Sequence, residues 1–75
     1  MQDYLNLSGN SGVAAFAISK DSITVKFVNG GTYVYTQRSA GRQNIAIMKT
    51  LAQRGKGLST FITTYVSDRY SARIA

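Results

Sequence analysis

Four residue types are absent from the 75-residue chain: cysteine, histidine, proline and tryptophan. Without cysteine, no disulfide can stabilise the fold, and no thiolate can bind zinc or attack a substrate. Without histidine, the chain lacks the commonest metal ligand and the usual general base near neutral pH. A Ser–His–Asp or Cys–His catalytic site is therefore impossible within this chain.

Acidic residues are also scarce, because the chain has no glutamate and its three carboxylates belong to Asp3, Asp21 and Asp68. A metal site built from oxygen ligands usually needs several carboxylates close together, and three aspartates scattered along the chain are poorly suited to that. Paired carboxylates for glycoside chemistry would have to be two of the same three. We therefore expect a protein that is not an enzyme and that uses no cofactor or metal.

Long apolar runs are missing too. The longest covers six residues, 13–18, whereas a helix that spans a membrane needs about 20. Residues 1–5 show no basic cluster followed by an apolar core, so no signal peptide is predicted. The hydrophobic fraction of 44% is nevertheless typical of a globular domain. These features favour a soluble, cytoplasmic protein with no membrane partner.

The chain divides into a short lead and one domain. Residues 6–12 are dominated by Ser, Asn and Gly, which favour turns or disorder. We expect residues 1–12 to form a flexible N-terminal lead and residues 13–75 to form a single small domain. A domain of this size buries only about 60% of its unfolded surface, so its core is thin.

Three strands are predicted in the first half of the domain, over residues 13–19, 22–28 and 32–36. The first strand alternates weakly, with Ala14, Phe16 and Ile18 on one face. The second alternates clearly, with Ile23, Val25 and Phe27 on one face. Asn29-Gly30-Gly31 is a strong hairpin signal, because Asn and Gly tolerate positive φ. The three strands are expected to form an antiparallel meander.

Two helices are predicted in the second half. Ser39 is a candidate cap for the first, which continues to about Arg54 with a core stripe at helical spacing. That stripe consists of Ile45, Met48, Leu51 and Ala52. Gly55 suits a helix end in the left-handed conformation, and Gly57 suits a tight corner. The second helix begins at Leu58, and its predicted apolar face consists of Leu58, Phe61, Ile62 and Tyr65.

The tail over residues 67–75 is left unassigned. The fold class is therefore α+β: a three-stranded antiparallel meander followed by two helices packed on one face (β-β-β-α-α).

The face of Tyr33 and Tyr35 depends on the length of the preceding hairpin loop. A two-residue loop at Asn29-Gly30 places both tyrosines on the solvent face with Lys26, where they would form a stacking platform for bases. A three-residue loop at residues 29–31 pairs Phe27 with Tyr33 and Val25 with Tyr35, and places both tyrosines in the core. The three-residue loop separates apolar from polar side chains more cleanly, so we favour it.

The segment from Ile23 to Tyr35 resembles the centre of the KTSC family. That family is named for a short domain at the C-terminus of some lysyl-tRNA synthetases, and it also occurs as small stand-alone bacterial and phage proteins. Its hallmark is a Tyr-x-Tyr after an apolar strand and a glycine turn, matched here by Tyr33-Val34-Tyr35. Residues 57–62 and Arg69-Tyr70 are similar to its closing segment. The resemblance implies a KTSC-like domain of unassigned function, with RNA binding suggested by the synthetase context.

Basic residues give the formal net charge of +6 and suggest a partner. Arg42 and Lys49 are expected on one flank of the first helix, because seven residues make nearly two turns. Arg54 and Lys56 stand in a Gly-rich corner where backbone N–H groups could also meet a phosphate. These four residues are candidates for contact with RNA or another nucleic acid, although the same charge is compatible with a solvated surface.

Two functions therefore stay open. The first is a small RNA- or DNA-binding module that uses the basic corner. The second is a protein-interaction or accessory module without a nucleic-acid role, in which a free sheet edge pairs with a partner strand or the chain associates with itself.

Overall fold

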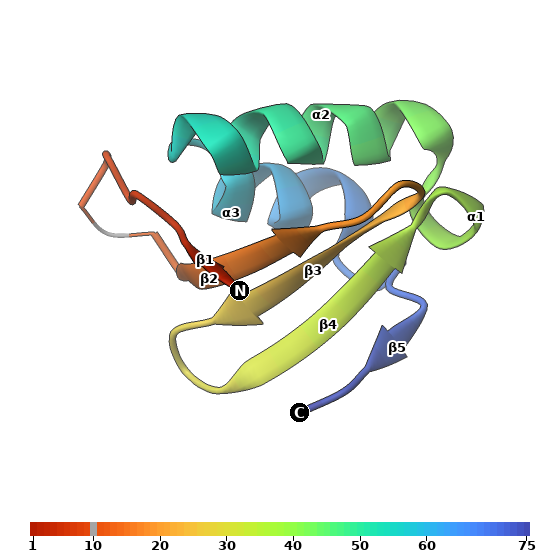
Figure 1. The fold of residues 1–75 in the computed structure, drawn as a ribbon, viewed down its shortest axis with the longest axis horizontal. Coiled ribbons are helices and arrows are strands. Elements are labelled where there is room, and N and C mark those ends of the chain that lie inside the picture. Colours follow the sequence, from red (N-terminus) through yellow and green to blue (C-terminus); the bar gives the residue numbers. More distant parts are fainter. Residues whose placement is uncertain (10) are drawn as a thin grey trace.

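The centre of the fold is a five-stranded antiparallel sheet in the order β1-β2-β3-β4-β5, seen in a computed structural model that describes residues 1–9 and 11–75. The strands are β1 (Gln2–Asp3), β2 (Val13–Ile18), β3 (Ser22–Phe27), β4 (Gly31–Thr36) and β5 (Ala72–Arg73). The helices are α1 (Gln37–Ala40), α2 (Arg42–Arg54), α3 (Leu58–Phe61) and the π-helical turn η1 (Ile62–Val66). Helices α2 and α3 lie on the same side of the sheet (Figure 1). The predicted α+β class is thus confirmed.

The predicted three-stranded meander is only the middle of this sheet. β1 pairs with β2, and β5 pairs with β4, so both outer strands were missed. Each outer strand consists of two exposed residues, and a strand of that length is too short to show an alternating pattern. The lead expected over residues 1–12 contributes β1 and the buried Tyr4 to the fold. The hydroxyl of Tyr4 accepts a hydrogen bond from the Leu58 amide at 3.2 Å.

The β3–β4 hairpin has a three-residue loop, one position earlier than predicted. Phe27 pairs with Gly31 and Val25 with Tyr33, so the loop is Val28-Asn29-Gly30. Gly30 has φ 101°, and its N–H donates to the Phe27 carbonyl oxygen at 3.2 Å. Each residue of β3 therefore pairs two positions earlier in β4 than predicted, and a shift of two residues leaves every side chain on its predicted face. Both tyrosines therefore lie on the same face as Val25 and Phe27, as predicted.

A bulge in β2 changes which of its residues are buried. Val13 pairs with Phe27 but Ala15 pairs with Lys26, so the register shifts between them. An inserted residue of this kind reverses the alternation of faces. Val13 and Phe16 both enter the core, whereas Ile18 is 38% exposed. The predicted inward face is therefore wrong at Ala14, because the bulge puts Val13 in the core instead. Phe16 and Ile18 still pair with Val25 and Ile23 on that face, although Ile18 is the last residue of the strand and is partly exposed.

The predicted first helix is two helices with different caps. Thr36, not Ser39, is the N-cap of α1, and the two side chains form a capping box with hydrogen bonds of 3.0 Å in each direction. Gly41 has φ 101° and separates α1 from α2. The predicted end of α2 is confirmed, because Gly55 adopts the left-handed conformation at φ 75°.

The second predicted helix starts at Leu58 but changes geometry after Phe61. Its buried residues are Leu58, Ile62 and Val66, four positions apart, because η1 opens the helix to π geometry. Tyr65, predicted to be in the core, is 61% exposed. The buried cluster joins these residues to α2 and to the central strands, with Ile23, Val25, Tyr35, Ile45 and Met48 among its members. Within the described residues, no helix has the length and apolar character needed to cross a bilayer.

Candidate functional site

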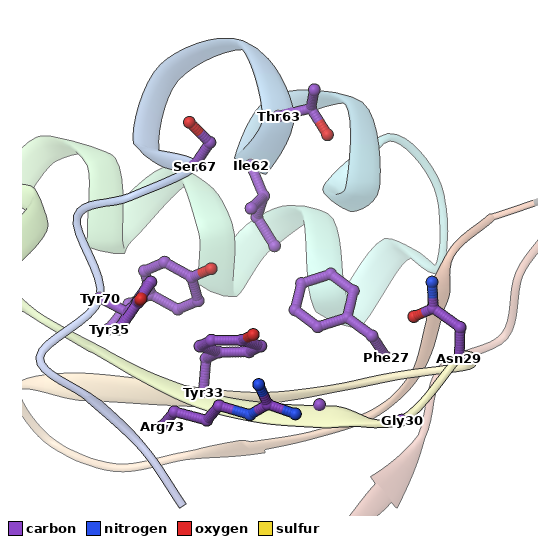
Figure 2. Close-up of a pocket in the computed structure, with 11 residues that line it drawn as sticks. Phe27, Asn29, Gly30, Tyr33, Tyr35, Ile62, Thr63, Ser67, Tyr70 and Arg73 are labelled. Atoms are coloured by element: carbon purple, nitrogen blue, oxygen red, sulfur yellow. The ribbon is translucent and has the colours of Figure 1, made fainter. Parts of the chain in front are cut away.

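A pocket of about 390 Å³ opens between the β3–β4 hairpin, the η1 turn and the C-terminal segment (Figure 2). Four of its walls are aromatic side chains: Phe27, Tyr33, Tyr35 and Tyr70. Its volume falls in the lower part of the range of small-molecule sites, about 300–1,000 Å³. The pocket is therefore large enough for one flat ring system and too small for a folded partner.

Tyr33 is the central wall of this pocket. Its ring centroid lies 4.7 Å from that of Tyr70 in a tilted pair, and 5.8 Å from that of Phe27 in an edge-to-face pair. The guanidinium carbon Cζ of Arg73 lies 5.5 Å from the Tyr33 centroid. Both ring pairs have the separations typical of attractive aromatic contacts, and the arginine is within cation–π range. The Tyr33 ring is therefore held by neighbours on several sides.

Tyr35 closes the inner end of the pocket. It is 2% exposed, and its ring makes an edge-to-face pair with Tyr70 at 6.3 Å. Burial raises the pKa of Tyr35 to about 12, and the neighbouring phenols of Tyr33 and Tyr70 add to the increase. Its hydroxyl therefore remains neutral at physiological pH and can donate a hydrogen bond.

The π-helical turn supplies the side of the pocket opposite the sheet. Ile62 points toward the aromatic rings, and Thr63 and Ser67 lie farther out (Figure 2). Turns of π geometry occur frequently at functional sites. On the hairpin side, Asn29 lies at the rim. The pocket thus combines an apolar interior with hydroxyl and amide groups near its opening.

The electrostatics of the pocket have one sign. Among the described residues that line it, Arg73 carries the one formal charge, and no carboxylate takes part. The Nε of Arg73 donates to a main-chain oxygen of Ala75 at 3.0 Å. A neutral or anionic ligand is therefore favoured over a cationic one.

The four cations named as candidates do not form one cluster. Arg42 begins α2 and Arg54 ends it, which separates their Cα atoms by about 18 Å along the helix axis. Lys49 is half-buried, and its Nζ donates to the Lys20 carbonyl oxygen at 2.8 Å. Lys56 is exposed in the corner between α2 and α3. Arg54 and Lys56 remain neighbours, whereas Arg42 lies at the far end of α2.

The Gly-rich corner is partly occupied by the chain itself. Gly55 and Gly57 both have positive φ, 75° and 87°. The carbonyl oxygen of Gly55 accepts a hydrogen bond from the Leu7 amide at 2.8 Å, and the Leu58 amide donates one to the Tyr4 hydroxyl. The corner therefore offers two cationic side chains, while the N-terminal segment takes part of its backbone. Of the described residues, no group of three or more His, Cys, Asp or Glu could hold a metal ion.

Sequence reasoning found Tyr33 and Tyr35 but missed Tyr70 and Arg73. All four belong to one pocket because β5 folds back beside β4, where Arg73 pairs with Tyr33. The one signal for this was the Arg69-Tyr70 match to the KTSC closing segment. Neither a family model, nor a curated protein, nor a solved structure matches this chain. The KTSC resemblance stays a prediction.

Proposed function

We propose that the protein is a small non-catalytic module that binds single-stranded RNA, with an unpaired base entering the tyrosine pocket. The observation that carries this proposal is the open aromatic pocket in which Arg73 lies against Tyr33. Single-stranded RNA is recognised by stacking its splayed bases on aromatic side chains and arginine planes. Such contacts contribute about 1–3 kcal/mol per base.

The charge of the chain supports the same proposal. Eight of the nine Lys and Arg side chains are exposed; Lys49 is half-buried. Basic side chains release counterions when they meet phosphates, which adds affinity without sequence preference. Arg54 and Lys56 are the two that lie closest in sequence, and we assign them to backbone contacts outside the pocket. The KTSC resemblance, with its link to a tRNA synthetase, favours RNA over DNA.

Fluorescence anisotropy with a labelled mixed-sequence RNA 8-mer at low salt tests the proposal. We expect saturable binding that weakens as salt rises, and weaker binding of the same sequence in a duplex, whose bases are already stacked. Tyr33→Leu should lower affinity for the single strand, whereas Tyr65→Leu, which removes an exposed tyrosine outside the pocket, should not. Equal affinity for duplex and single strand, or no binding, contradicts the proposal.

A second candidate is a protein-interaction module, favoured by the sheet face opposite the helices. Of the residues that the structure describes, none forms a helix on that side (Figure 1). The outer strands β1 and β5 are each two residues long. Self-association through this face would remove sheet surface from water. Light scattering at high protein concentration tests this alternative, and the mass of a single chain would count against it.

A further inference from the structure

The space inside the pocket lies between one face of Tyr33 and the side chain of Ile62. In Figure 2 the Tyr33 ring is seen nearly edge-on, with Ile62 on one side of its plane and the guanidinium group of Arg73 on the other. Phe27 lies at one end of this space, and Tyr35 and Tyr70 lie at the other. A flat ring inserted parallel to Tyr33 would therefore be covered by Ile62 and bounded by aromatic edges.

The aromatic walls alone fit two ligand classes. Aromatic cages bind quaternary ammonium groups by cation–π attraction, and aromatic platforms bind nucleobases by stacking. Arg73 separates these two possibilities, because its positive charge already lies 5.5 Å from the Tyr33 centroid. A second cation on the opposite face of the same ring would be repelled by it, and among the described residues that line the pocket there is no Asp or Glu to offset the repulsion. The charge therefore favours a nucleobase.

Arg73 is also placed to contact a phosphate. Within the described part of the chain, its side chain makes one hydrogen bond, from Nε to a main-chain oxygen of Ala75. That contact leaves the two Nη groups for a ligand. Guanidinium groups bind phosphate oxygens through paired, charge-assisted hydrogen bonds. Arg73 is exposed and lines the pocket, so a phosphate attached to the bound base can approach it from solvent.

We propose that the unit recognised by the pocket is one unstacked nucleotide, with its base between Tyr33 and Ile62 and its phosphate at Arg73. This inference rests on the proposed function and specifies the ligand of the same site. Thr63 and Asn29 stand at the rim, where their hydroxyl and amide groups can bond the polar edge of the base or the sugar. The pocket should then bind a free mononucleotide without help from the basic corner.

An amide NMR titration with adenosine 5′-monophosphate tests this directly. Chemical shifts should change at Gly30, Gly31, the η1 turn and Arg73, and should remain constant at residues 54–57. Adenosine should bind at the same place more weakly, because it has no phosphate for Arg73. Tetramethylammonium, which suits an aromatic cage for cations, should bind more weakly than either.

Three variants separate stacking from charge. Tyr33→Leu should weaken adenosine 5′-monophosphate binding by about 5- to 150-fold, the range that corresponds to the loss of one stacked aromatic. Tyr33→Phe keeps the ring and should restore binding, which distinguishes lost stacking from lost folding. Arg73→Gln should weaken binding of adenosine 5′-monophosphate but leave that of adenosine nearly unchanged. Tyr65→Leu is the matched control and should leave both affinities at the wild-type value.

The outcomes distinguish this inference from the proposed function. If the RNA 8-mer binds but the mononucleotide shifts only residues 54–57 or nothing, the single-nucleotide site is wrong and RNA binding stands. If neither binds, both proposals are wrong. Tighter binding of tetramethylammonium than of adenosine 5′-monophosphate overturns the assignment in favour of a cation cage.

Discussion

The ring of Tyr33 occupies the space that a side chain at Gly31 would need. A Cβ atom at position 31 would lie 2.6 Å from Cε1 of Tyr33 and 3.3 Å from its Cζ and Oη. The two residues are on the same strand and face, two positions apart, and Tyr33 lies against the glycine backbone. Of the two consecutive glycines in the hairpin, Gly30 supplies the positive φ and Gly31 makes room for a pocket wall.

Gly31→Ala should therefore displace the Tyr33 ring. A forced shift of this kind costs about 1–3 kcal/mol, and we expect that loss in urea unfolding, together with changed NMR shifts of the Tyr33 ring protons. Gly30→Ala is the comparison. Its Cβ would meet nothing within 4 Å, but its φ of 101° is strained for alanine. Gly30→Ala should lose stability but keep the wild-type NMR shifts of the Tyr33 ring protons. Unchanged ring-proton shifts in Gly31→Ala would show that a side chain at position 31 does not displace Tyr33.

Much of the central hairpin could be predicted from the sequence because its pattern is local. Alternation from Ile23 to Phe27 and the parity of the three-residue loop placed Tyr33 and Tyr35 on the inward face, as the structure has them. The position of the loop could not be settled, because either glycine can adopt positive φ. In the structure Gly30 adopts it, and Gly31 lies in β4 with its Cα against the Tyr33 ring.

The C-terminal half of the pocket could not be predicted, for a physical reason. β5 is held to β4 by backbone hydrogen bonds such as Ser71 N–H to the Val34 carbonyl oxygen at 2.6 Å. Backbone hydrogen bonds do not depend on side-chain identity. A strand of two residues is also too short to show alternating apolar and polar positions in the sequence. The π turn was missed similarly, since the spacing of Leu58, Phe61 and Ile62 also fits an ordinary α-helix.

The raised pKa of Tyr35 predicts a loss of stability at alkaline pH. The unfolded chain releases this proton near the ordinary tyrosine pKa of about 10, whereas the folded chain holds it up to a pKa of about 12. The contribution is fully present below pH 10 and is lost as pH rises toward 12, because the unfolded state then binds fewer protons. Two pKa units correspond to about 3 kcal/mol.

The measurement for Tyr35 is urea unfolding at pH 9 and pH 11, compared between wild type and Tyr35→Phe. Other groups titrate in both proteins, so the difference between their pH dependences isolates Tyr35. We expect the wild type to lose more stability than the variant over this interval. Parallel losses would show that Tyr35 titrates alike in the folded and unfolded chains.

Substitutions in the basic corner should change RNA binding in a different way from substitutions in the pocket. Arg54→Gln combined with Lys56→Gln should weaken RNA binding by a similar factor for every sequence. It should also reduce the slope of log affinity against log salt by about 1.4, since each phosphate contact on a single strand contributes about 0.7. Lys26→Gln is the matched control, because Lys26 is exposed on the sheet face opposite Val25. A salt slope unchanged in the double variant would show that the corner makes no phosphate contact.

The last prediction concerns the hydrogen bond between Tyr4 and Leu58, which ties the N-terminal segment to the start of α3. The bond is buried and 3.2 Å long, and Tyr4 is 6% exposed. Tyr4→Phe keeps the ring but leaves the Leu58 amide without its acceptor, which costs about 1–3 kcal/mol for a buried donor. Tyr65→Phe removes a hydroxyl from a tyrosine that is 61% exposed, so its unfolding midpoint in urea should match that of wild type. If the Tyr4→Phe midpoint matches it as well, the first residues of the chain are not anchored to α3 through this bond.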